Sequence, residues 1–567
     1  MPKGKKWELL SKSSSDDILK ILLANRGLKS EKEIEEFLHP QLEKVTPKSV
    51  GIDLPQLKKA IARIIVAIKK KEQIIVFGDY DVDGITGNAI LWETLHAMNA
   101  NCLPFIPNRK DEGYGLSLKA LQNPELVAKQ PQLIITVDNG IVANEAVDFA
   151  TEQGIDVIIT DHHTVSETLP DAYAIVHTTN LCGAGVAYLL TKEIQKNVIP
   201  AKAGIYGSLN KSGMTAKEDT HLELAALGTV ADLVPLTGAN RAIVAEGLKK
   251  LHTTTRPGLL ALFQQAKIEQ DAIGVYEIGY LIGPRLNAAG RIESAMDSLR
   301  LLCTTNMSRA RELAAKLELT NRERQQLLKE ATEHAIAKVK SEKSEVKSLL
   351  IVGHASYAEG VIGLVAGRLV EAFYRPAIVL SLGETTSKAS VRSISGFNII
   401  EFLRLHREHF INVGGHPMAA GFTIETVKLA SLQKLLEEKA ETLIQEELLV
   451  RSLKIDCELP FDLLTKGLYK QMQQLAPFGM ANPEPVFVSK EVTVESFRIL
   501  GKERNHLKLV LRQEGKILEA IAFGMGELAE RLNPGDTIDI AYVLDENTWN
   551  GETKLQLKVR DIKSIEV

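Results

Sequence analysis

The chain has 567 residues, of which 45% are hydrophobic and 25% charged, and its formal net charge at pH 7 is −4. The length predicts about three or four domains, and the composition is that of a globular protein. The charge excludes a protein that is basic over its whole surface, but it allows a local basic groove for nucleic acid. Four scattered cysteines without a C-x-x-C pair support neither a zinc site nor a disulfide framework. Because no signal peptide and no membrane-spanning apolar run is recognisable, a cytoplasmic protein is expected.

The first half of the chain alternates between helical patterns and buried strands. Residues 1–50 carry two short helical patterns, and a longer helix is expected over 57–71. Near-continuous apolar strands follow, separated by helices, at 73–78, 101–106, 132–138, 155–160 and 172–176. This alternation predicts an α/β domain with a parallel, doubly wound sheet.

Three aspartates follow the first of these strands at alternate positions, in the stretch VFGDYDVDGITG: Asp79, Asp81 and Asp83. Carboxylates at this spacing repel one another unless a cation neutralises them, so the stretch predicts a metal site. A helix is expected to begin after it, at about residue 88. Two other interpretations of the stretch are an EF-hand loop and an aspartyl-phosphatase loop, and a third is an acidic turn without function. The EF-hand lacks its glutamate, since position twelve is Ile90, and the phosphatase lacks a second aspartate loop at suitable spacing.

Further acidic and histidine side chains follow other strands of the same predicted sheet. One strand ends in Asp138-Asn139-Gly140 and another in Asp161-His162-His163. A parallel sheet brings the carboxyl ends of its strands to one edge, where ligands bind. Asp232, flanked by apolar residues after a helical stretch, is a fourth contributor. Carboxylates with histidine and no cysteine suit Mn²⁺ or Mg²⁺, and their number predicts two ions bridged by a shared carboxylate.

These motifs, in this order, resemble those of the DHH phosphoesterase superfamily. The segments GPRLNAAGRIESA (283–295) and LAPFGMANPEPVF (475–487) narrow the resemblance to the RecJ-like single-stranded-DNA-specific exonucleases, from about residue 50 onward. The resemblance implies that two divalent ions are held by Asp79, Asp81, Asp83, Asp138, His162 and Asp232. It implies that His163 acts as an acid or positioning group near the departing oxygen, with Asp138 and Asp161 beside it as catalytic residues. From the residues alone, His163 could equally orient Asp161 or bind metal, and Asp161 is expected to brace the histidine pair.

Several residues are expected to hold the substrate. Small residues and arginines in the segment 283–291 suit close approach to a phosphate backbone, and Arg109 follows a strand at the same sheet edge. In the second α/β region, glycine-rich turns are expected to form anion-binding loops, and the resemblance implies that Ser390 and Arg392 there help to hold the 5′ phosphate. The expected substrate-binding residues are Arg109, Arg285, Asn287, Arg291, Ser390, Arg392 and His416.

Some positions depart from the pattern of the family. Tyr357, Ala358 and Glu359 stand where a Trp-His pair is usual, and Val391 replaces a glycine. Since valine restricts a backbone approach that glycine allows, these positions are expected to affect end preference and rate.

The predicted organisation has five parts: an N-terminal helical segment (1–50), a DHH domain (51–300), a connecting helix (301–347), a smaller α/β DHH-associated domain (348–450) and a C-terminal β-barrel (451–567). The barrel is expected to be OB-like and to bind single strands. Its possible stacking residues are Phe478, Phe497, His506, Phe523 and Trp549, of which half or more are expected to be core.

The resemblance implies a metal-dependent 5′-to-3′ exonuclease that degrades single-stranded DNA to mononucleotides in DNA repair and recombination. One alternative is a DHH phosphodiesterase for short oligonucleotides or cyclic dinucleotides, whose members are generally shorter and lack the β tail. Another is an inactive single-strand-binding scaffold, which the presence of all six proposed ligands disfavours. A helicase and a single-strand-binding protein are the expected partners of a monomer with no membrane association.

Overall fold

The structure, a computed structural model, describes residues 5–12, 17–108, 112–113, 115–202, 221–292, 294–341, 347–549 and 551–564. Contacts within the chain divide it into two compact units. The first unit comprises Glu35–Arg324 and Ala476–Pro483, and the second comprises Met1–Ile34, Gln325–Leu475 and Glu484–Val567. The division into five parts stays a prediction.

A five-stranded parallel sheet forms the centre of the first unit, which confirms the predicted fold class. The strands lie in the order β3-β2-β4-β5-β6, and their bounds are close to the predicted ones: β2 (Ile74–Gly78), β3 (Cys102–Phe105), β4 (Leu133–Val137), β5 (Asp156–Asp161) and β6 (Ala174–His177).

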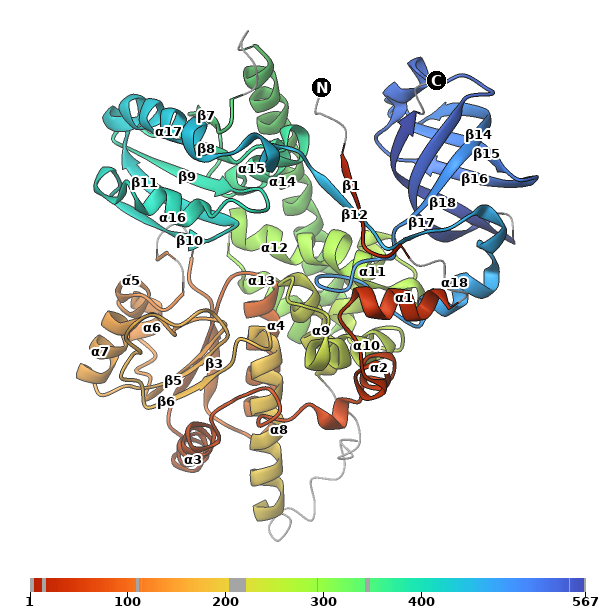
Figure 1. The fold of residues 1–567 in the computed structure, drawn as a ribbon. Helices are drawn as coiled ribbons and strands as arrows, with labels where there is room; N and C mark the ends of the chain where they lie inside the picture. Colours follow the sequence, from red (N-terminus) through yellow and green to blue (C-terminus); the bar gives the residue numbers. More distant parts are fainter. Residues whose placement is uncertain are drawn as a thin grey trace. The chain divides into compact units, whose positions relative to one another are not determined.

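Helices cover both faces of this sheet, as expected for a doubly wound arrangement (Figure 1). One hydrophobic core packs against α3 (Leu54–Lys70), α4 (Val82–Ala97) and α8 (Gly183–Lys202). The opposite core packs against α5 (Leu118–Leu121), α6 (Pro124–Val127) and α7 (Asn144–Glu152).

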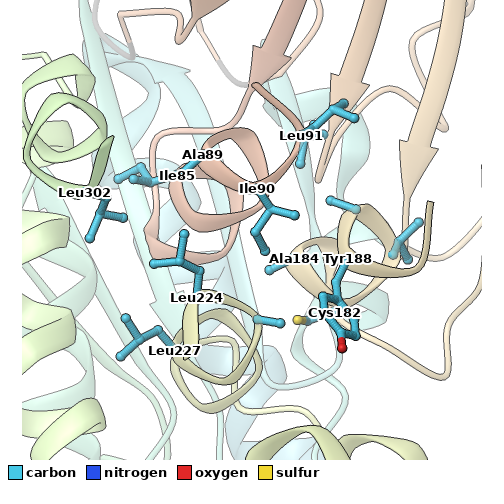
Figure 2. Packing of buried hydrophobic residues seen from close by; sticks show 14 of the residues in the cluster. Ile85, Ala89, Ile90, Leu91, Cys182, Ala184, Tyr188, Leu224, Leu227 and Leu302 are labelled. Carbon is cyan, nitrogen blue, oxygen red and sulfur yellow. The ribbon is translucent and has the colours of Figure 1, made fainter. Parts of the chain in front are cut away.

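Helix α4 begins at Val82, six residues before the position predicted from the sequence. The reason is capping, because the Asp81 carboxylate accepts hydrogen bonds from the backbone N–H groups of Asp83 and Gly84. The first turns of α4 are buried on all sides, since α8 and α9 (Leu222–Ala231) pack around them. Figure 2 shows this packing, with Ile90 of α4 beside Ala184 of α8 and near Leu224 of α9.

The rest of the first unit is helical. A π-helix, η3 (Glu277–Ile282), runs directly into α12. Tyr280 of this helix stacks on Tyr276, the residue before its first turn, and both tyrosines are exposed. The predicted long charged helix is α14, which begins in the first unit and ends in the second. The helices are α10 (Gly238–Leu251), α11 (Pro257–Ala266), α12 (Gly283–Ile292), α13 (Met296–Cys303) and α14 (Met307–Ser341).

The second unit contains a mixed sheet in the order β10-β11-β9-β8-β7, in which only β7 and β8 are parallel. This is the predicted smaller α/β region. Its strands are β7 (Leu350–His354), β8 (Ala377–Ser381), β9 (Thr386–Arg392), β10 (Asn412–His416) and β11 (Ala419–Glu425). Its helices are α15 (Ile362–Phe373), α16 (Ile399–Arg404) and α17 (Leu429–Leu443).

The same unit ends in a closed barrel, as predicted for the tail. Strand β14 pairs with both β15 and β17, and β18 links β16 to β17. The strands are β14 (Phe487–Leu500), β15 (His506–Gln513), β16 (Lys516–Ala522), β17 (Thr537–Trp549) and β18 (Glu552–Ser564), extended by β13 (Cys457–Glu458). Helix α18 (Lys466–Gln473) precedes them.

The chain begins with a strand that the sequence did not predict. Strand β1 (Lys6–Leu9) pairs in parallel with β12 (Ser452–Ile455), and the helices α1 (Ile18–Asn25) and α2 (Glu31–Leu38) follow it. A pairing across more than four hundred residues leaves no local pattern in the sequence. Among the described residues, no helix has both the length and the apolar content needed to cross a bilayer.

Candidate metal centre

Four segments bring acidic and histidine side chains together in the first unit. Strands β2, β4 and β5 end at their carboxyl edge in the three predicted loops, and α9 ends at Asp232. The ligand atoms fall into three groups, each within 4.8 Å: Asp138 with His162 and His163, Asp83 with His162 and Asp232, and Asp79 with Asp81 and Asp138. The predicted convergence is therefore present, and Asp138 and His162 each belong to two groups.

His162 occupies the middle of this cluster. Its Nε2 lies 3.0 Å from an oxygen of Asp138, 3.6 Å from Asp232 and 3.7 Å from Asp83. Burial is the main cause of a lowered pKa at His162. A neutral imidazole is the form that ligates metals, because its ring nitrogen then has a lone pair to offer.

Asp138 is positioned by an unusual backbone. Its φ is 65°, in the left-handed region that non-glycine residues seldom adopt. The next side chain, Asn139, is 1% exposed and ties neighbouring segments together: its Nδ2 donates to the carbonyls of Phe77 and Val137, and its Oδ1 accepts from the N–H of Leu116. Gly140 follows with a φ of 109°, so the Asp-Asn-Gly sequence serves a backbone turn that holds the carboxylate in place.

Asp83 is held by the beginning of α8. Its two carboxylate oxygens accept hydrogen bonds from the N–H groups of Gly183, at 2.6 Å, and Ala184, at 2.8 Å. A negative charge is favoured at a helix N-terminus. The sequence did not single out this contact, although the glycines of the CGAG segment are its signal.

Two glycines are needed because the elements of the site approach closely. A Cβ added at Gly183 would lie 2.5 Å from Cβ of Asp138, and one added at Gly228 would lie 2.7 Å from a carboxylate oxygen of Asp83. These residues were missed by sequence reasoning, since their role depends on packing between α8, α9 and the strand ends.

The carboxylates of the cluster raise one another's proton affinity. Burial, followed by the charges of Asp83 and Asp81, raises the pKa of Asp138 well above its ordinary value. The same causes raise the pKa of Asp232 to about 8. Asp232 is less enclosed than the sequence implied, with 23% of its side chain exposed, because it follows the last turn of α9 at the surface.

Asp161 holds the His162–His163 pair, as predicted. One of its oxygens accepts from the backbone N–H groups of both histidines and lies 2.8 Å from Nδ1 of His163, and the other accepts from the N–H of Ile141. Burial opposes the charged form of His163, but the hydrogen bond and charge of Asp161 outweigh it and raise the pKa of His163 to about 9.

The cluster fits divalent cations. The His162 Nε2 and one Asp138 oxygen are buried and have no hydrogen bond, although a buried polar atom normally has a partner. The donors are hard carboxylate oxygens with imidazole and without thiolate, the set that Mn²⁺ and Mg²⁺ prefer. A positive charge among these atoms would remove the repulsion that raises the carboxylate pKa values.

Helix α12 braces the metal loop rather than exposing its small residues to a ligand. Asn287 Oδ1 accepts a hydrogen bond from the N–H of Val82, at the start of α4. A Cβ at Gly290 would lie 2.6 Å from the carbonyl oxygen of Tyr80. Arg285 donates from Nε to Glu318 on α14 and from Nη1 to the carbonyl of Leu281. The small residues of this segment thus serve close packing on protein, and Arg291 lies half-buried in its last turn. The substrate contacts expected of this segment stay a prediction.

In the second unit, Ser390 and Arg392 lie in strand β9, and His416 is the last residue of β10. The prediction of glycine-rich loops for them was wrong, because these segments pair with β11. Arg392 and His416 both pair with Ala419, so they lie in one row on the same face of the sheet. A Cβ at Gly363 would lie 2.9 Å from Ser390 Oγ and 3.4 Å from Arg392 Nη2, so both side chains lie beside the start of α15.

The unusual residues of this region have structural roles. Val391 is fully buried in the core on the opposite face of β9, so its side chain points away from Ser390 and Arg392. This corrects the expectation that Val391 restricts an approach to the anion-binding side. Tyr357 is buried and its hydroxyl lies 2.7 Å from Nδ1 of His334, while Glu359 forms an ion pair with Lys388.

Arg109 lies outside the described residues, as does the side chain of Trp549. The other possible stacking residues are not core: Phe478, Phe497 and His506 are half-buried, and Phe523 is 58% exposed and packs edge-on against His506. Phe497 pairs with the fully buried Leu509 and so lies on the inner face of the barrel, whereas His506 pairs with Leu500 on the other face. Since none of the four described residues is fully buried, the expectation that half or more are core was wrong for them.

Three family models match the chain: the DHH family, N-terminal domain, at residues 73–229; the DHHA1 domain, at 346–443; and the RecJ OB domain, at 455–561. The single-stranded-DNA-specific exonuclease RecJ of Bacillus subtilis is 36% identical over 95% of this chain and 67% of its own length. The protein of the same name from Salmonella typhimurium is 32% identical, over 96% of this chain and 95% of its own.

A solved relative agrees with the fold. RecJ from Thermus thermophilus, in complex with Mn²⁺, has a TM-score of 0.81 and 29% identity, covering 99% of this chain and 80% of its own. The same protein in complex with Mg²⁺ has a TM-score of 0.75 and 28% identity, covering 99% of this chain and 79% of its own. Since these similarities extend over nearly the whole chain, the chain belongs to the RecJ family of single-stranded-DNA-specific exonucleases.

Proposed function

We propose that this chain is a metal-dependent 5′-to-3′ exonuclease that hydrolyses single-stranded DNA to mononucleotides in DNA repair and recombination. The observation that carries the proposal is the convergence of five carboxylates and two histidines at one sheet edge, in a chain that also carries the OB barrel of its relatives. Mn²⁺ or Mg²⁺ is the cofactor, since the donor set fits these ions and a solved relative is in complex with each.

The six proposed ligands would hold two ions, and Asp138, which belongs to two of the ligand groups, would be a candidate for the shared carboxylate. Asp79 and Asp81 lie with Asp138 in one group, and Asp83, His162 and Asp232 form another. Two ions bound there would neutralise phosphate charge and make water a stronger nucleophile. Gly183 and Gly228 keep the carboxylates in place through close packing.

His163 is the proposed acid near the departing oxygen. Asp161 fixes Nδ1 of the ring at 2.8 Å, which orients Nε2 as the atom that donates a proton. The raised pKa of His163, about 9, keeps this ring protonated at neutral pH in the metal-free site.

The substrate-binding set remains as the family resemblance implies it. Ser390, Arg392 and His416 share one face of a sheet beside the start of α15, which suits a terminal phosphate. Arg285, Asn287 and Arg291 belong to α12, next to the metal loop, and Arg109 is the remaining member.

The five-part division, a cytoplasmic location, a monomeric state and delivery of the strand by a helicase or a single-strand-binding protein complete the proposal. Size-exclusion chromatography with light scattering tests the monomer, and a co-purification from cells tests the partners.

The central experiment is digestion of an end-labelled single-stranded DNA with Mn²⁺, with Mg²⁺ and with chelator, labelling each end in turn. Release of mononucleotides from the 5′ label, only with metal, is the expected result. Cleavage restricted to dinucleotides or cyclic dinucleotides would overturn the substrate, and strand binding without cleavage would identify a scaffold.

A further inference from the structure

Two arginines of the first unit bind one carboxylate, and a third arginine lies near one of them. Arg285 of α12 donates from Nε to one oxygen of Glu318, at 2.7 Å, and Arg322 of α14 donates from Nε to the other, at 2.9 Å. Arg324 lies two residues further along α14 and forms no ion pair with any carboxylate of the described residues. The group therefore carries three positive charges and one negative charge.

Arg324 is the most unusual member, because it is buried. The residue is 8% exposed, and its Nε and Nη2 donate only to the amide oxygen of Asn321, at 3.3 and 2.9 Å. Asn321 is itself 1% exposed and neutral, so it offers Arg324 a hydrogen bond and no counter-charge.

A buried guanidinium without a counter-ion is costly, and proteins normally pair such charges. Burial, and next the positive charge of Arg285, lowers the pKa of Arg324. The Nη1 group takes part in no hydrogen bond with the described residues. An anion beside Arg324 would supply the missing charge.

The position of the cluster indicates which anion. Arg285 belongs to the same helix as Asn287, whose side chain accepts a hydrogen bond from the metal loop. One member of the cluster, Arg285, thus lies on the helix that braces the metal centre, and the others lie on α14 beside it. Arginine is the residue that matches phosphate oxygens with paired N–H donors.

We propose that Arg324, with Arg285 beside it and Arg322 joined to Arg285 through Glu318, binds a backbone phosphate of the single-stranded DNA substrate. This inference rests on the proposed function. The phosphate belongs to the intact strand and not to the released mononucleotide, and the experiment below distinguishes the two.

The test measures binding of a fluorescent single-stranded oligonucleotide over a series of salt concentrations, in chelator so that nothing is cleaved. Arg324→Gln keeps a donor for Asn321 and removes the charge. It is expected to weaken binding about tenfold and to reduce the slope of log affinity against log salt by about 0.7, the value for one lost phosphate contact on a single strand. Arg324→Lys is expected to keep the slope. Addition of a nucleoside monophosphate is expected to leave the difference between Arg324→Gln and wild type unchanged.

The control is Arg309→Gln, which removes an exposed charge from the same helix, where Arg309 pairs only with Glu312 among the described residues. Its slope is expected to equal that of the wild type. An unchanged slope in Arg324→Gln, with a lowered melting temperature, would make Arg324 a structural residue and overturn the inference. If the added monophosphate abolishes the difference in strand affinity between Arg324→Gln and wild type, the arginine cluster binds the mononucleotide product instead of the strand.

Two further outcomes keep the inferences separate. If Arg324→Gln does not fold, Arg322→Gln removes a charge whose side chain is 68% exposed, and an unchanged slope there overturns the cluster as a phosphate site. A wild-type protein that neither binds nor digests single-stranded DNA would instead overturn the proposed function.

Discussion

Asp138 is the carboxylate on which the metal centre depends most. It belongs to two of the three ligand groups, and its backbone adopts a left-handed conformation to place it there. Strain of this kind persists at functional sites because the surrounding structure enforces it. Here the hydrogen bonds of Asn139 and the turn at Gly140 hold the backbone of Asp138 in this conformation.

Asp138→Asn keeps the shape of the side chain and removes its charge. We expect turnover to fall by more than about a hundredfold, because loss of an outer partner of a metal ligand already costs about 10–100-fold. The affinity for the DNA strand, measured in chelator, should stay within about twofold of the wild-type value. The variant removes a negative charge near the phosphates and no positive charge. Steady-state digestion and Mn²⁺ titration calorimetry measure the two effects. The exposed Asp171→Asn is the matched control, and turnover equal to wild type in Asp138→Asn would contradict the metal assignment.

A second residue-scale prediction concerns a buried ion pair away from the metal. Glu93 of α4 pairs with Arg256, at 2.6 Å, and lies 3.0 Å from His221. Although burial alone would raise it, the pKa of Glu93 is lowered by the His221 hydrogen bond and the charge of Arg256. A lowered folded-state pKa stabilises the protein above the unfolded value of 4.5, and this stability is lost as the pH falls through the folded value.

We expect Glu93→Gln to lower the free energy of unfolding by about 2 kcal/mol at pH 7, because it removes one of the two counter-charges of Arg256 and leaves only Glu223. The difference from wild type should shrink as the pH falls below 4.5. Thermal unfolding from pH 7 to pH 3 measures it, with the surface variant Glu246→Gln as the control. A difference that stays constant over this range would show that Glu93 acts without its charge.

At the scale of the element, close helix packing sets the geometry of the ligands. Helix α9 passes Asp83 with only a glycine, Gly228, between them, and the start of α8 donates two N–H groups to the same carboxylate. The ligands are therefore held by helix ends and backbones as much as by their own strands.

Gly228→Ala and Gly367→Ala form a matched pair, because both glycines lie inside α-helices. The Cβ at residue 228 would collide with Asp83, whereas the one at residue 367 meets nothing within 4 Å. We expect Gly228→Ala to reduce Mn²⁺ affinity by about tenfold or more, and Gly367→Ala to raise stability by up to about 1 kcal/mol. Titration calorimetry measures the Mn²⁺ affinity of the two variants, and thermal unfolding measures their stability. Equal Mn²⁺ affinity in the two variants would contradict the packing account.

The same scale shows what a sequence can and cannot reveal. The five parallel strands were predictable because each is a local apolar run, and the ligands followed because strand ends share an edge. The first residue of α4 was not predictable, because capping by Asp81 outweighs the preference of aspartate and glycine for loops. The inward side of Val391 and the close approach of Gly183 depend on partners distant in sequence, which no local pattern records.

At the scale of the whole molecule, the two units are interlocked in sequence. The first unit includes residues 476–483, where the carbonyls of Ala476 and Pro477 accept hydrogen bonds from the buried Arg241. The second unit includes the first residues of the chain. Neither unit is a continuous stretch that can be cut out at a linker.

A chain of residues 1–470 should therefore have a less stable first unit than one of residues 1–486. The shorter chain leaves the Arg241 guanidinium without two acceptors, at about 1–3 kcal/mol for each. Limited proteolysis, followed by mass spectrometry of the surviving first-unit fragment, compares them. Equal resistance of the two fragments would show that the segment 476–483 contributes nothing to that unit.

The terminal strand β1 also has a consequence for how the protein is made. Trp7 donates from its indole to Asp561, a partner 554 residues later. At about 5–20 residues per second, translation brings out that partner roughly half a minute to two minutes after Trp7. Strand β12, which supplies the edge for β1, is made earlier than Asp561 but still follows β1 by the whole of residues 10–451, so the N-terminal strand stays unpaired while most of the chain is made.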